Sequence, residues 1–289
     1  MKLLVKLFLI IFLFSFINSC KDNATNPTVS GFKGYIYYST ASSIYRINMS
    51  TQLSEKLFTN ARYPDITAKG EILVQETYQL RLILTDLTGA NRKSIMEGTD
   101  YKGPIHRRGM DHPRISYNQK YIAYDGGSVY NPVTYVIDAV TGTLVATIGD
   151  YNANNPLYQP SWAPDGSLYV MGWTSMNNGI YKVSSDFKTV TRVDPNFTNV
   201  AYPSVSPDGK SIAFVRDGQV WTMGIDGTNP KQFYLSTETF YNPTWSPDSK
   251  YIVATGKWSA FIFDIAKNTY TELSKAGYIS PDDQLCWVY

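Results

Sequence analysis

The stretch YPSVSPDGKSIAFV at residues 202–215 decides the fold, because close copies of it recur along the chain. The copies QPSWAPDGSLYV at 159–170 and NPTWSPDSKYIV at 242–253 share its proline spacing. In each copy the second proline fixes φ for a turn, and the aspartate that follows it bonds nearby backbone. The run after the turn is rich in Ile, Val, Phe and Tyr, which is typical of a buried strand. We therefore predict a β-hairpin at each copy.

Weaker copies extend the pattern over most of the chain. They read YPDITAKGEILV at 63–74, HPRISYNQKYIAY at 112–124 and, as a fragment, ISPDDQLCWV at 279–288. The five leading prolines, at 64, 113, 160, 203 and 243, are 49, 47, 43 and 40 residues apart. A strand-rich repeat of roughly 40–50 residues indicates a propeller blade. Because proline has no N–H, each leading proline is expected on an edge strand that faces a channel or solvent.

The two chain ends are predicted to complete one blade together. Tyr35–Tyr38, Ser43–Asn48 and Glu55–Phe58 match the outer strands of a repeat that lacks its first strand. The C-terminal fragment supplies a first strand around Tyr278–Pro281 and a second in Leu285–Tyr289. With five full copies, this composite gives an all-β, six-bladed β-propeller of four-stranded blades, closed by N- and C-terminal strands that share one blade. Closure removes the open sheet edge of a linear array.

Two positions of the repeat have a predicted structural role. The residue two places after each leading proline is expected in the interface between blades, where burial contributes about 1.5–3 kcal/mol per side chain; the set is Ile66, Ile115, Trp162, Val205, Trp245 and Ile279. Aspartates also begin the turn before the last strand of several copies, at Asp86, Asp138, Asp226 and Asp264. These aspartates could ligate calcium, but we interpret them as turn residues that bond their own backbone.

The N-terminus has the pattern of a lipoprotein signal peptide. A basic start precedes an apolar run from Leu7 to Ile17, which is shorter than the roughly 20 residues that span a bilayer. The following INSC resembles the bacterial lipobox, whose cysteine, here Cys20, carries lipid; ordinary secretion is the alternative. We expect a signal peptide at 1–19, a lipidated Cys20 with a polar tether at 20–31, and the propeller at 32–289. This organisation predicts a lipid-anchored protein of the bacterial envelope, on the outer membrane.

Composition limits the possible partners. The chain has 26 Lys and Arg against 24 Asp and Glu. This near balance argues against electrostatic binding of nucleic acid over a broad surface. Apart from Cys20 the chain holds one cysteine, Cys286, so no internal disulfide is expected. We expect a monomer that contacts the membrane through its lipid.

The copies at 159–170, 202–215 and 242–253, which combine to Pro-x-Trp-Ser-Pro-Asp-Gly-Lys-x-Ile-Ala-Phe, resemble the TolB-type, or WD40-like, β-propeller repeat. The resemblance covers nearly all of the chain from about Tyr35, and DGTNPKQ at 226–232 resembles the usual third turn of that repeat. The first two full copies depart from the pattern, with Lys69 and Gln119 where Asp208 stands. The motif implies a fold but says little about function.

Relatives of this repeat include enzymes, and their catalytic features are a useful contrast. Prolyl oligopeptidases add a hydrolase domain with a Gly-x-Ser-x-Gly motif, which this sequence lacks. Oligogalacturonate lyases use several histidines with a metal ion, whereas this chain has only His106 and His112. We therefore expect no cofactor, no metal and no catalytic residue. An envelope enzyme that acts on acidic glycans is the alternative.

The predicted ligand face carries the loops that lead from one blade into the next. The residue before each leading proline falls there, which gives a ring of hydrogen-bonding side chains: Tyr63, His112, Gln159, Tyr202 and Asn242. Arg216 follows a second strand on the same face. The longest loop holds His106, Arg107 and Arg108, and two adjacent arginines suit a carboxylate or phosphate; a solvated basic loop is the alternative. These residues predict a non-catalytic protein that binds an unidentified envelope protein or glycan, or else a structural part of a larger assembly.

Overall fold

The computed structural model describes residues 31–97, 109–127, 132–150, 155–173, 178–194, 197–233, 237–273, 276–281 and 283–289. In this part of the chain every regular element is a β-strand. No helix there is long and apolar enough to cross a membrane. The all-β class predicted from the repeats is confirmed.

The strands follow one another as antiparallel meanders. The first sheet uses β1 (Tyr35–Thr40), β2 (Ser43–Asn48), β3 (Leu53–Thr59) and β24 (Cys286–Val288), and the second uses β4 (Ala61–Ile66), β5 (Ile72–Glu76), β6 (Arg81–Thr85) and β7 (Lys93–Met96). Next come β8 (Asp111–Ile115), β9 (Tyr121–Gly127), β10 (Pro132–Asp138), β11 (Leu144–Ile148), β12 (Leu157–Trp162), β13 (Leu168–Trp173), β14 (Asn178–Val183) and β15 (Val190–Arg192). The last two sheets use β16 (Val200–Val205), β17 (Ser211–Arg216), β18 (Gln219–Gly224) and β19 (Lys231–Gln232), then β20 (Tyr241–Trp245), β21 (Tyr251–Thr255), β22 (Ala260–Asp264) and β23 (Thr269–Glu272).

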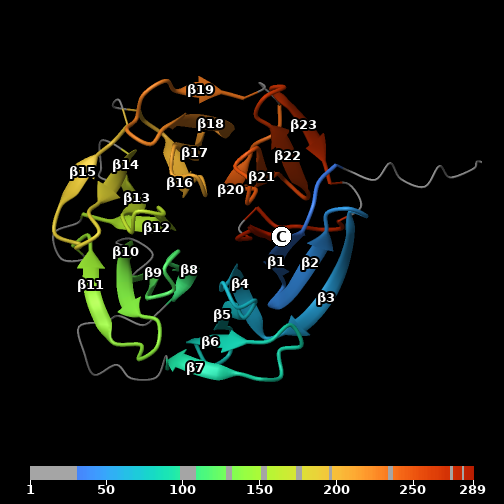
Figure 1. Ribbon diagram of the computed structural model, residues 1–289, viewed down its shortest axis with the longest axis vertical. Helices are drawn as coiled ribbons and strands as arrows, with labels where there is room; N and C mark the ends of the chain where they lie inside the picture. The colour runs from blue at the N-terminus through green and yellow to red at the C-terminus, as the bar shows by residue number, and fades with distance from the viewer. Residues whose placement is uncertain are drawn as a thin grey trace, which may run out of the picture.

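The sheets are arranged around a central axis, with β4, β8, β12, β16 and β20 innermost (Figure 1). Four of them have four strands each, while β8 to β15 form one sheet of eight. Within the sheet of eight, the meanders β8–β11 and β12–β15 are joined through a single parallel pair, Val133 with Leu157. The architecture is a β-propeller, as predicted, although six separate four-stranded sheets were expected. The difference arises because β12 lies close enough to β10 to form this one pair.

The Pro-Asp-Gly turns form as their residue types predict. The Ser206 hydroxyl bonds Asp208 Oδ1 at 2.6 Å, and the same oxygen accepts the Lys210 N–H. Gly209 then takes φ +70° and donates its N–H to the Ser206 carbonyl. Glycine suits this position because it adopts positive φ at little cost. The turn reverses the chain between β16 and β17 and completes the predicted hairpin.

The structure corrects one correspondence between copies. In the β8–β9 turn, Asn118 bonds the Ser116 hydroxyl and accepts the Lys120 N–H, which are the contacts that Asp208 makes. Asn118 is therefore the counterpart of Asp208, and Gln119, at φ +61°, is the counterpart of the turn glycine. This copy departs less from the repeat than its sequence suggested.

The two chain ends pair in one sheet, but in a register that differs from the prediction. β24 lies antiparallel to β1, with Trp287 opposite Ile36, and 278–281 form no strand. Trp287 pairs with Ile36 as Trp245 pairs with Ile252, so Trp287 has the place of Trp245 in the repeat. Ile279 is also buried between this sheet and the sheet before it, as predicted, although it lies outside any strand. The sequence Pro-Asp-Asp at 281–283 resembles the Pro-Asp-Gly of the hairpin turns, but it comes before β24 and not after it.

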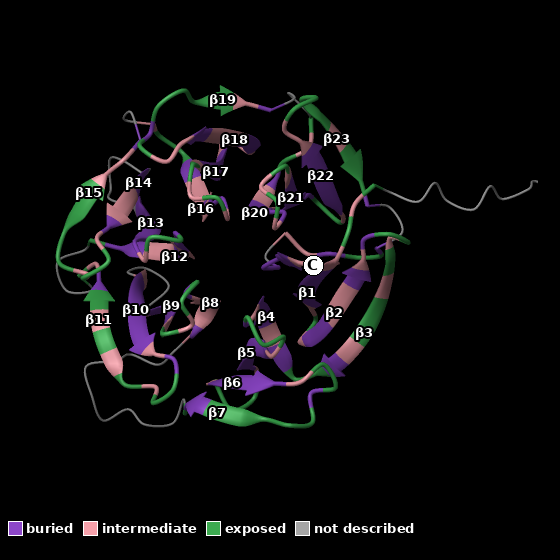
Figure 2. Cartoon of the chain, viewed as in Figure 1, coloured by how far each residue is buried: buried purple, intermediate pink, exposed green. Residues whose placement is uncertain are grey.

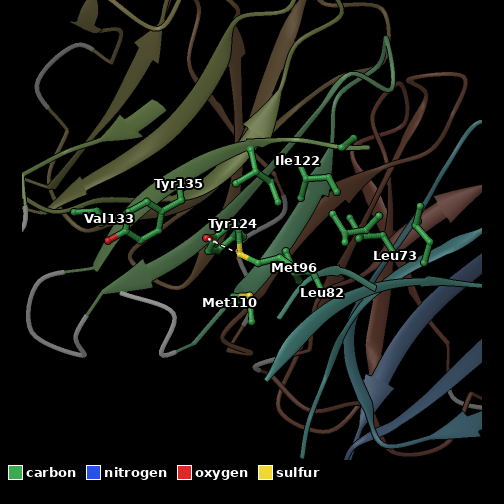
Figure 3. Packing of buried hydrophobic residues seen from close by; sticks show 12 residues of the cluster. Leu73, Leu82, Met96, Met110, Ile122, Tyr124, Val133 and Tyr135 are labelled. Atoms are coloured by element: carbon green, nitrogen blue, oxygen red, sulfur yellow. Dashed lines mark hydrogen bonds between the residues drawn. The ribbon is translucent and has the colours of Figure 1, made fainter. Parts of the chain in front are cut away.

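The core lies between neighbouring sheets. One buried cluster joins Leu73, Leu82 and Met96 of the second sheet to Tyr124 and Tyr135 of the next (Figure 3). The Tyr124 hydroxyl lies 3.4 Å from Met96 Sδ. Burial decreases outward, so that the peripheral strands β3, β11 and β23 are largely exposed (Figure 2). The inner strands are thereby held in fixed positions around the axis.

The turn aspartates bond their own backbone, as predicted. Asp86 Oδ1 accepts the N–H groups of Thr88 and Ala90, and Asp138 Oδ1 accepts those of Val140 and Thr141. These bonds lower the pKa of both carboxyl groups, with the Thr88 hydroxyl as the main cause for Asp86. Their oxygens are used in forming the turns.

Candidate functional site

The inner strands share a strained position at the residue before each leading proline. The pairing of each inner strand with its neighbour shifts register there, as in a β-bulge. The φ angles of this set are positive: Tyr63 54°, His112 51°, Gln159 57°, Tyr202 56° and Asn242 46°. Positive φ is uncommon for residues other than glycine and persists where surrounding contacts hold it. Each of these residues comes three positions before the interface residue of its copy, as Asn242 does before Trp245. Gln284 comes three positions before Trp287, so we count it as the sixth member. We call these six residues the bulge ring.

Hydrogen bonds between sheets fix the bulge ring. The Gln159 N–H donates to Asp125 Oδ1 at 2.7 Å, and Gln159 Oε1 in turn accepts the Tyr202 N–H at 2.8 Å. Tyr63 donates its N–H to the Ser39 hydroxyl at 3.1 Å. Each bond joins an inner strand to the meander before it, and the Gln159–Asp125 bond lies within the sheet of eight. These bonds therefore connect neighbouring meanders along the axis.

His112 and Asn242 also have partners inside the protein. His112 Nδ1 lies 3.0 Å from Asp125 Oδ2, and its ring lies 4.7 Å from that of Tyr63. Burial raises the pKa of Asp125, and the hydrogen bond from His112 opposes that rise. Asn242 Nδ2 donates to the Pro281 carbonyl at 2.8 Å. These residues belong to the inner strands around the axis, and their role in ligand binding stays a prediction.

Arg216 ends β17, where it pairs with Val200, two residues before Tyr202. Its guanidinium carbon stands 4.2 Å from the ring centre of Phe197 and 5.1 Å from that of Trp221. Its Nε is 3.6 Å from Asp217. The other predicted cations, Arg107 and Arg108, lie outside the described residues together with His106.

A cavity of ≈ 710 Å³ opens at the other end of the axis, on the face formed by the hairpin turns. Pro207, Pro247 and the turns at 67–70 and 116–119 contribute to it. Its wall includes the residue that follows each leading proline and the equivalent residue of β24: Asp65, Arg114, Ser161, Ser204, Thr244 and Cys286. We call these six residues the cavity ring. The sequence analysis did not select any of them, because the residue type at this position changes from copy to copy.

One side of the cavity ring is charged. Arg114 Nη1 lies 3.8 Å from Asp65 Oδ1 and donates to the Leu285 carbonyl at 3.2 Å. Asp65 Oδ2 accepts the Ile115 N–H at 2.8 Å. Burial raises the pKa of Asp65, and the nearby Arg114 opposes that rise. Burial likewise raises the pKa of the Cys286 thiol well above its usual value.

Three further members of the cavity ring, Ser161, Ser204 and Thr244, carry hydroxyl groups. Ser161 Oγ accepts the Val205 N–H at 2.9 Å, and Thr244 Oγ1 donates to the Leu285 carbonyl at 3.1 Å. Leu87, Tyr117 and Tyr289 stand at the mouth and are 39%, 47% and 64% exposed. The cavity thus combines a charged pair, hydroxyl groups and an apolar rim. Such a mixture is typical of sites that bind a ligand in a fixed orientation.

The cavity ends before the bulge ring, since no member of that ring lines it. Gln284 is 1% exposed there, and its Nε2 donates to the carbonyls of Pro64 and Pro113 at 3.1 Å each. Its Oε1 has no hydrogen-bond partner among the residues that the structure describes. One side chain, two residues before β24, therefore links the C-terminal segment to both β4 and β8. In the sequence, only the spacing between Gln284 and Trp287 indicates that Gln284 belongs to the bulge ring.

Sheets around a central axis, with a polar-walled cavity at one end, define a β-propeller. The chain belongs to the TolB beta propeller domain family, whose model matches residues 65–280. The resemblance seen in the sequence is confirmed.

Relatives and solved structures agree with this family. The Tol-Pal system protein TolB of Francisella tularensis subsp. tularensis (strain WY96-3418) is 30% identical over 182 residues, which are 60% of this chain and 39% of that protein. The matched region thus spans about two fifths of the relative. TolB from Acinetobacter baumannii superposes with a TM-score of 0.67 at 18% identity, over 87% of this chain and 66% of that one. A chain of a nidogen/laminin complex reaches 0.64 at 10% identity, over 87% and 97%, so the likeness to solved structures is one of fold.

Proposed function

We propose that this protein is a non-catalytic binding protein of the bacterial envelope, and that it receives a segment of a partner polypeptide in its axial cavity. The cavity on the hairpin-turn face carries the proposal, because polar side chains from six inner segments line an open space there. The oxygens of Asp65 contact Ile115 and Arg114, which favours recognition over proton transfer. The name of the Francisella relative, a Tol-Pal system protein, supports a place in an envelope assembly.

Six blades are part of the proposal. The sheet of eight is held together at its middle by one parallel pair, whereas its two halves are antiparallel meanders with several pairs between adjacent strands. Each half repeats the plan of the four-stranded sheets, with a leading proline in its first strand. Counting the halves as two blades gives six.

The lipid anchor is a further part of the proposal. A lipidated Cys20 and a tether at 20–31 would be followed by β1, whose first residue, Tyr35, lines the cavity. A tether of this length reaches at most ~40 Å when extended. The cavity would then open close to the membrane that holds the lipid, which we propose is the outer membrane. Labelled palmitate incorporated by the natural protein and not by Cys20→Ala would support the anchor, and equal labelling would contradict it.

Site-specific photocrosslinking in cells tests the binding face. A photoreactive phenylalanine at Tyr117, on the cavity rim, should form a discrete adduct with a partner protein. The same group at Trp258, which is 58% exposed and does not line the cavity, should not form that adduct. Ser204→Trp, which fills part of the cavity, should abolish the Tyr117 adduct while thermal unfolding stays cooperative. An adduct that survives Ser204→Trp would contradict binding in the cavity.

The predicted ligand face at the other end of the axis supports a second proposal of lower rank. Arg216 and the bulge ring remain candidates there, and an enzyme acting on acidic glycans is the matching alternative. Unsaturated products from oligogalacturonate incubated with the protein and Mn²⁺ or Ca²⁺ would favour the enzyme. An adduct from Trp258 and none from Tyr117 would favour binding at that face.

A further inference from the structure

The cavity ring is electrostatically lopsided, and this asymmetry points to the chemistry of the ligand. Its charged residues, Asp65 and Arg114, come from neighbouring sheets and lie together. Ser161, Ser204 and Thr244 add hydroxyl groups to the wall, and the Thr244 hydroxyl donates to the same Leu285 carbonyl as Arg114. A ligand in this cavity therefore meets one cation that is accompanied by hydroxyl groups.

Arg114 is held firmly from its backbone to its guanidinium. Its carbonyl accepts the Trp162 indole N–H at 2.9 Å, and the next residue, Ile115, donates its N–H to Asp65. At the far end of the side chain, Nη1 bonds the Leu285 carbonyl. Preorganised donors bind an incoming group at a lower entropic cost than mobile ones.

Most donors of Arg114 have no partner in the part of the chain that the structure describes. A guanidinium carries five N–H groups, and the single hydrogen bond observed here uses one of them. Asp65 at 3.8 Å is too far for a hydrogen bond, although it is close enough to interact electrostatically. The side chain of Arg114 is 24% exposed. Arg114 thus keeps the capacity to pair with a planar anionic group, which is the geometry that carboxylates offer.

The other cation of the cavity wall has a carboxylate partner. Arg46 donates to Glu55 through Nε, and its guanidinium carbon lies 4.7 Å from the ring centre of Tyr35. Burial lowers the pKa of Arg46, but its hydrogen bonds to Glu55 and Tyr37 outweigh burial and raise it. Arg114 has no carboxylate within hydrogen-bond distance among the described residues, so it is the cation of the wall that an incoming anion can pair with.

The three indoles of the wall favour a peptide over a sugar, whereas Tyr117 and Tyr289 at the mouth stay exposed. Trp162, Trp245 and Trp287 are 4%, 6% and 5% exposed, and each indole N–H donates to a backbone carbonyl. Such buried rings have no free face on which a pyranose could stack. The Ser204 hydroxyl, in contrast, can bond the backbone amide of an extended peptide.

We propose that Arg114 binds a carboxylate of the partner polypeptide, either an acidic side chain or the C-terminal carboxylate, within the axial cavity. This inference rests on the proposed function, because it names the group that the cavity recognises. Asp65 limits the affinity, since it places a negative charge beside the incoming carboxylate. The cavity ring then distinguishes acidic segments from neutral and basic ones.

Calorimetric titration of the full chain with short peptides tests the proposal. The probes are acetyl-Gly-Phe-Glu-Phe-Gly-amide, its Gln counterpart as amide, and the Gln counterpart with a free C-terminus. We expect one of the two acidic probes to bind at least about tenfold more tightly than the neutral one, as one charge-assisted pair predicts. The acidic probe that binds identifies the source of the carboxylate.

Arginine variants complete the test. Arg114→Gln should remove the preference for acid, Arg114→Lys should keep part of it, and Asp65→Asn should strengthen it. Because Arg114→Gln leaves Asp65 unpaired, Asp65→Asn/Arg114→Gln provides a variant without either charge, which should bind all three peptides equally. Equal binding of the acidic and neutral probes to the natural protein, no binding of any probe, or a preference that survives Arg114→Gln would overturn the proposal. Tighter, Arg114-dependent binding of trigalacturonate would also overturn it, in favour of a glycan.

The proposed function and this inference fail in different ways. A Tyr117 photoadduct that Ser204→Trp abolishes but Arg114→Gln leaves unchanged would keep the cavity as the binding site and reject the carboxylate. Loss of cavity binding altogether, with an adduct only at Trp258, would reject the proposed function itself.

Discussion

The bulge ring and the cavity ring lie two residues apart along the same six inner segments, yet they differ in backbone conformation and in surroundings. Residues of the bulge ring have positive φ in the five strands with a leading proline and do not line the cavity. The cavity ring faces an open space, and Arg114 retains unused donors there, although Asp65 and Ser161 also bond the next sheet. The position of a residue within the repeat, more than its chemical type, therefore decides whether its side chain reaches the cavity. The predictions that follow challenge this comparison.

The largest effect is expected from Trp287, which closes the ring beside both sets of residues. Trp287→Ala removes a side chain that is 5% exposed, together with its hydrogen bond to Lys33, and should lower the free energy of unfolding by about 3–5 kcal/mol. Urea unfolding measures the change. Trp258→Ala, at a 58% exposed position, is the matched control and should change stability by less than about 0.5 kcal/mol. Similar losses in both variants would show that β24 does not stabilise the ring.

Gln284 should have the next largest effect. Gln284→Ala leaves the carbonyls of Pro64 and Pro113 without this donor in a buried site and should cost about 1–3 kcal/mol in urea unfolding. Gln79→Ala, at an exposed position, serves as the control and should be nearly neutral. A neutral Gln284→Ala would mean that the bulge ring does not depend on contacts at the axis.

A pair of small substitutions compares the two rings directly. Gln159→Ala removes the acceptor of the Tyr202 N–H and should cost about 1 kcal/mol, because that N–H loses its partner. Ser204→Ala, in the cavity ring, should stay within about 0.5 kcal/mol of the natural protein. Thermal unfolding of both variants gives the order, and the reverse order would contradict the division of roles.

The smallest expected effect is a pH dependence from Asp65. Burial raises the pKa of this carboxyl above 3.8, so the folded protein binds its proton more tightly than the unfolded chain does. The resulting stabilisation is complete below 3.8 and is lost as pH rises through the folded pKa. The natural protein should therefore gain stability relative to Asp65→Asn as pH falls toward 3.8, in urea unfolding at a series of pH values. A relative loss over that range would mean that Arg114 outweighs burial.

The sequence was sufficient for the fold because the hairpin signal is local. Proline, aspartate and glycine at 207–209 determine a turn through their own backbone preferences, and each copy repeats the information. The final strand was misplaced because Pro281 imitates that signal in the wrong register, while pairing with β1 decides the strand. Pairing across the whole chain is not visible in a local motif.

The candidate site was harder to predict from the sequence than the fold. The residue before each leading proline attracted attention because His112, Gln159 and Tyr202 are polar, and the structure shows that each makes contacts near the axis. The residue after the proline ranges from Asp65 to Cys286, so no pattern marks it. The residue after each leading proline lines the cavity because side chains alternate along a strand, and this alternation turns it toward the axis once the blades form a closed ring.

The amide of Gln284 has a consequence for how any partner is held. Because it donates to carbonyls of both β4 and β8 just beyond the residues that line the cavity, this amide fastens the end of the chain to two other blades beneath the candidate site. Under the proposed function, a partner segment that enters from the hairpin-turn face meets Gln284 at the inner end of the cavity.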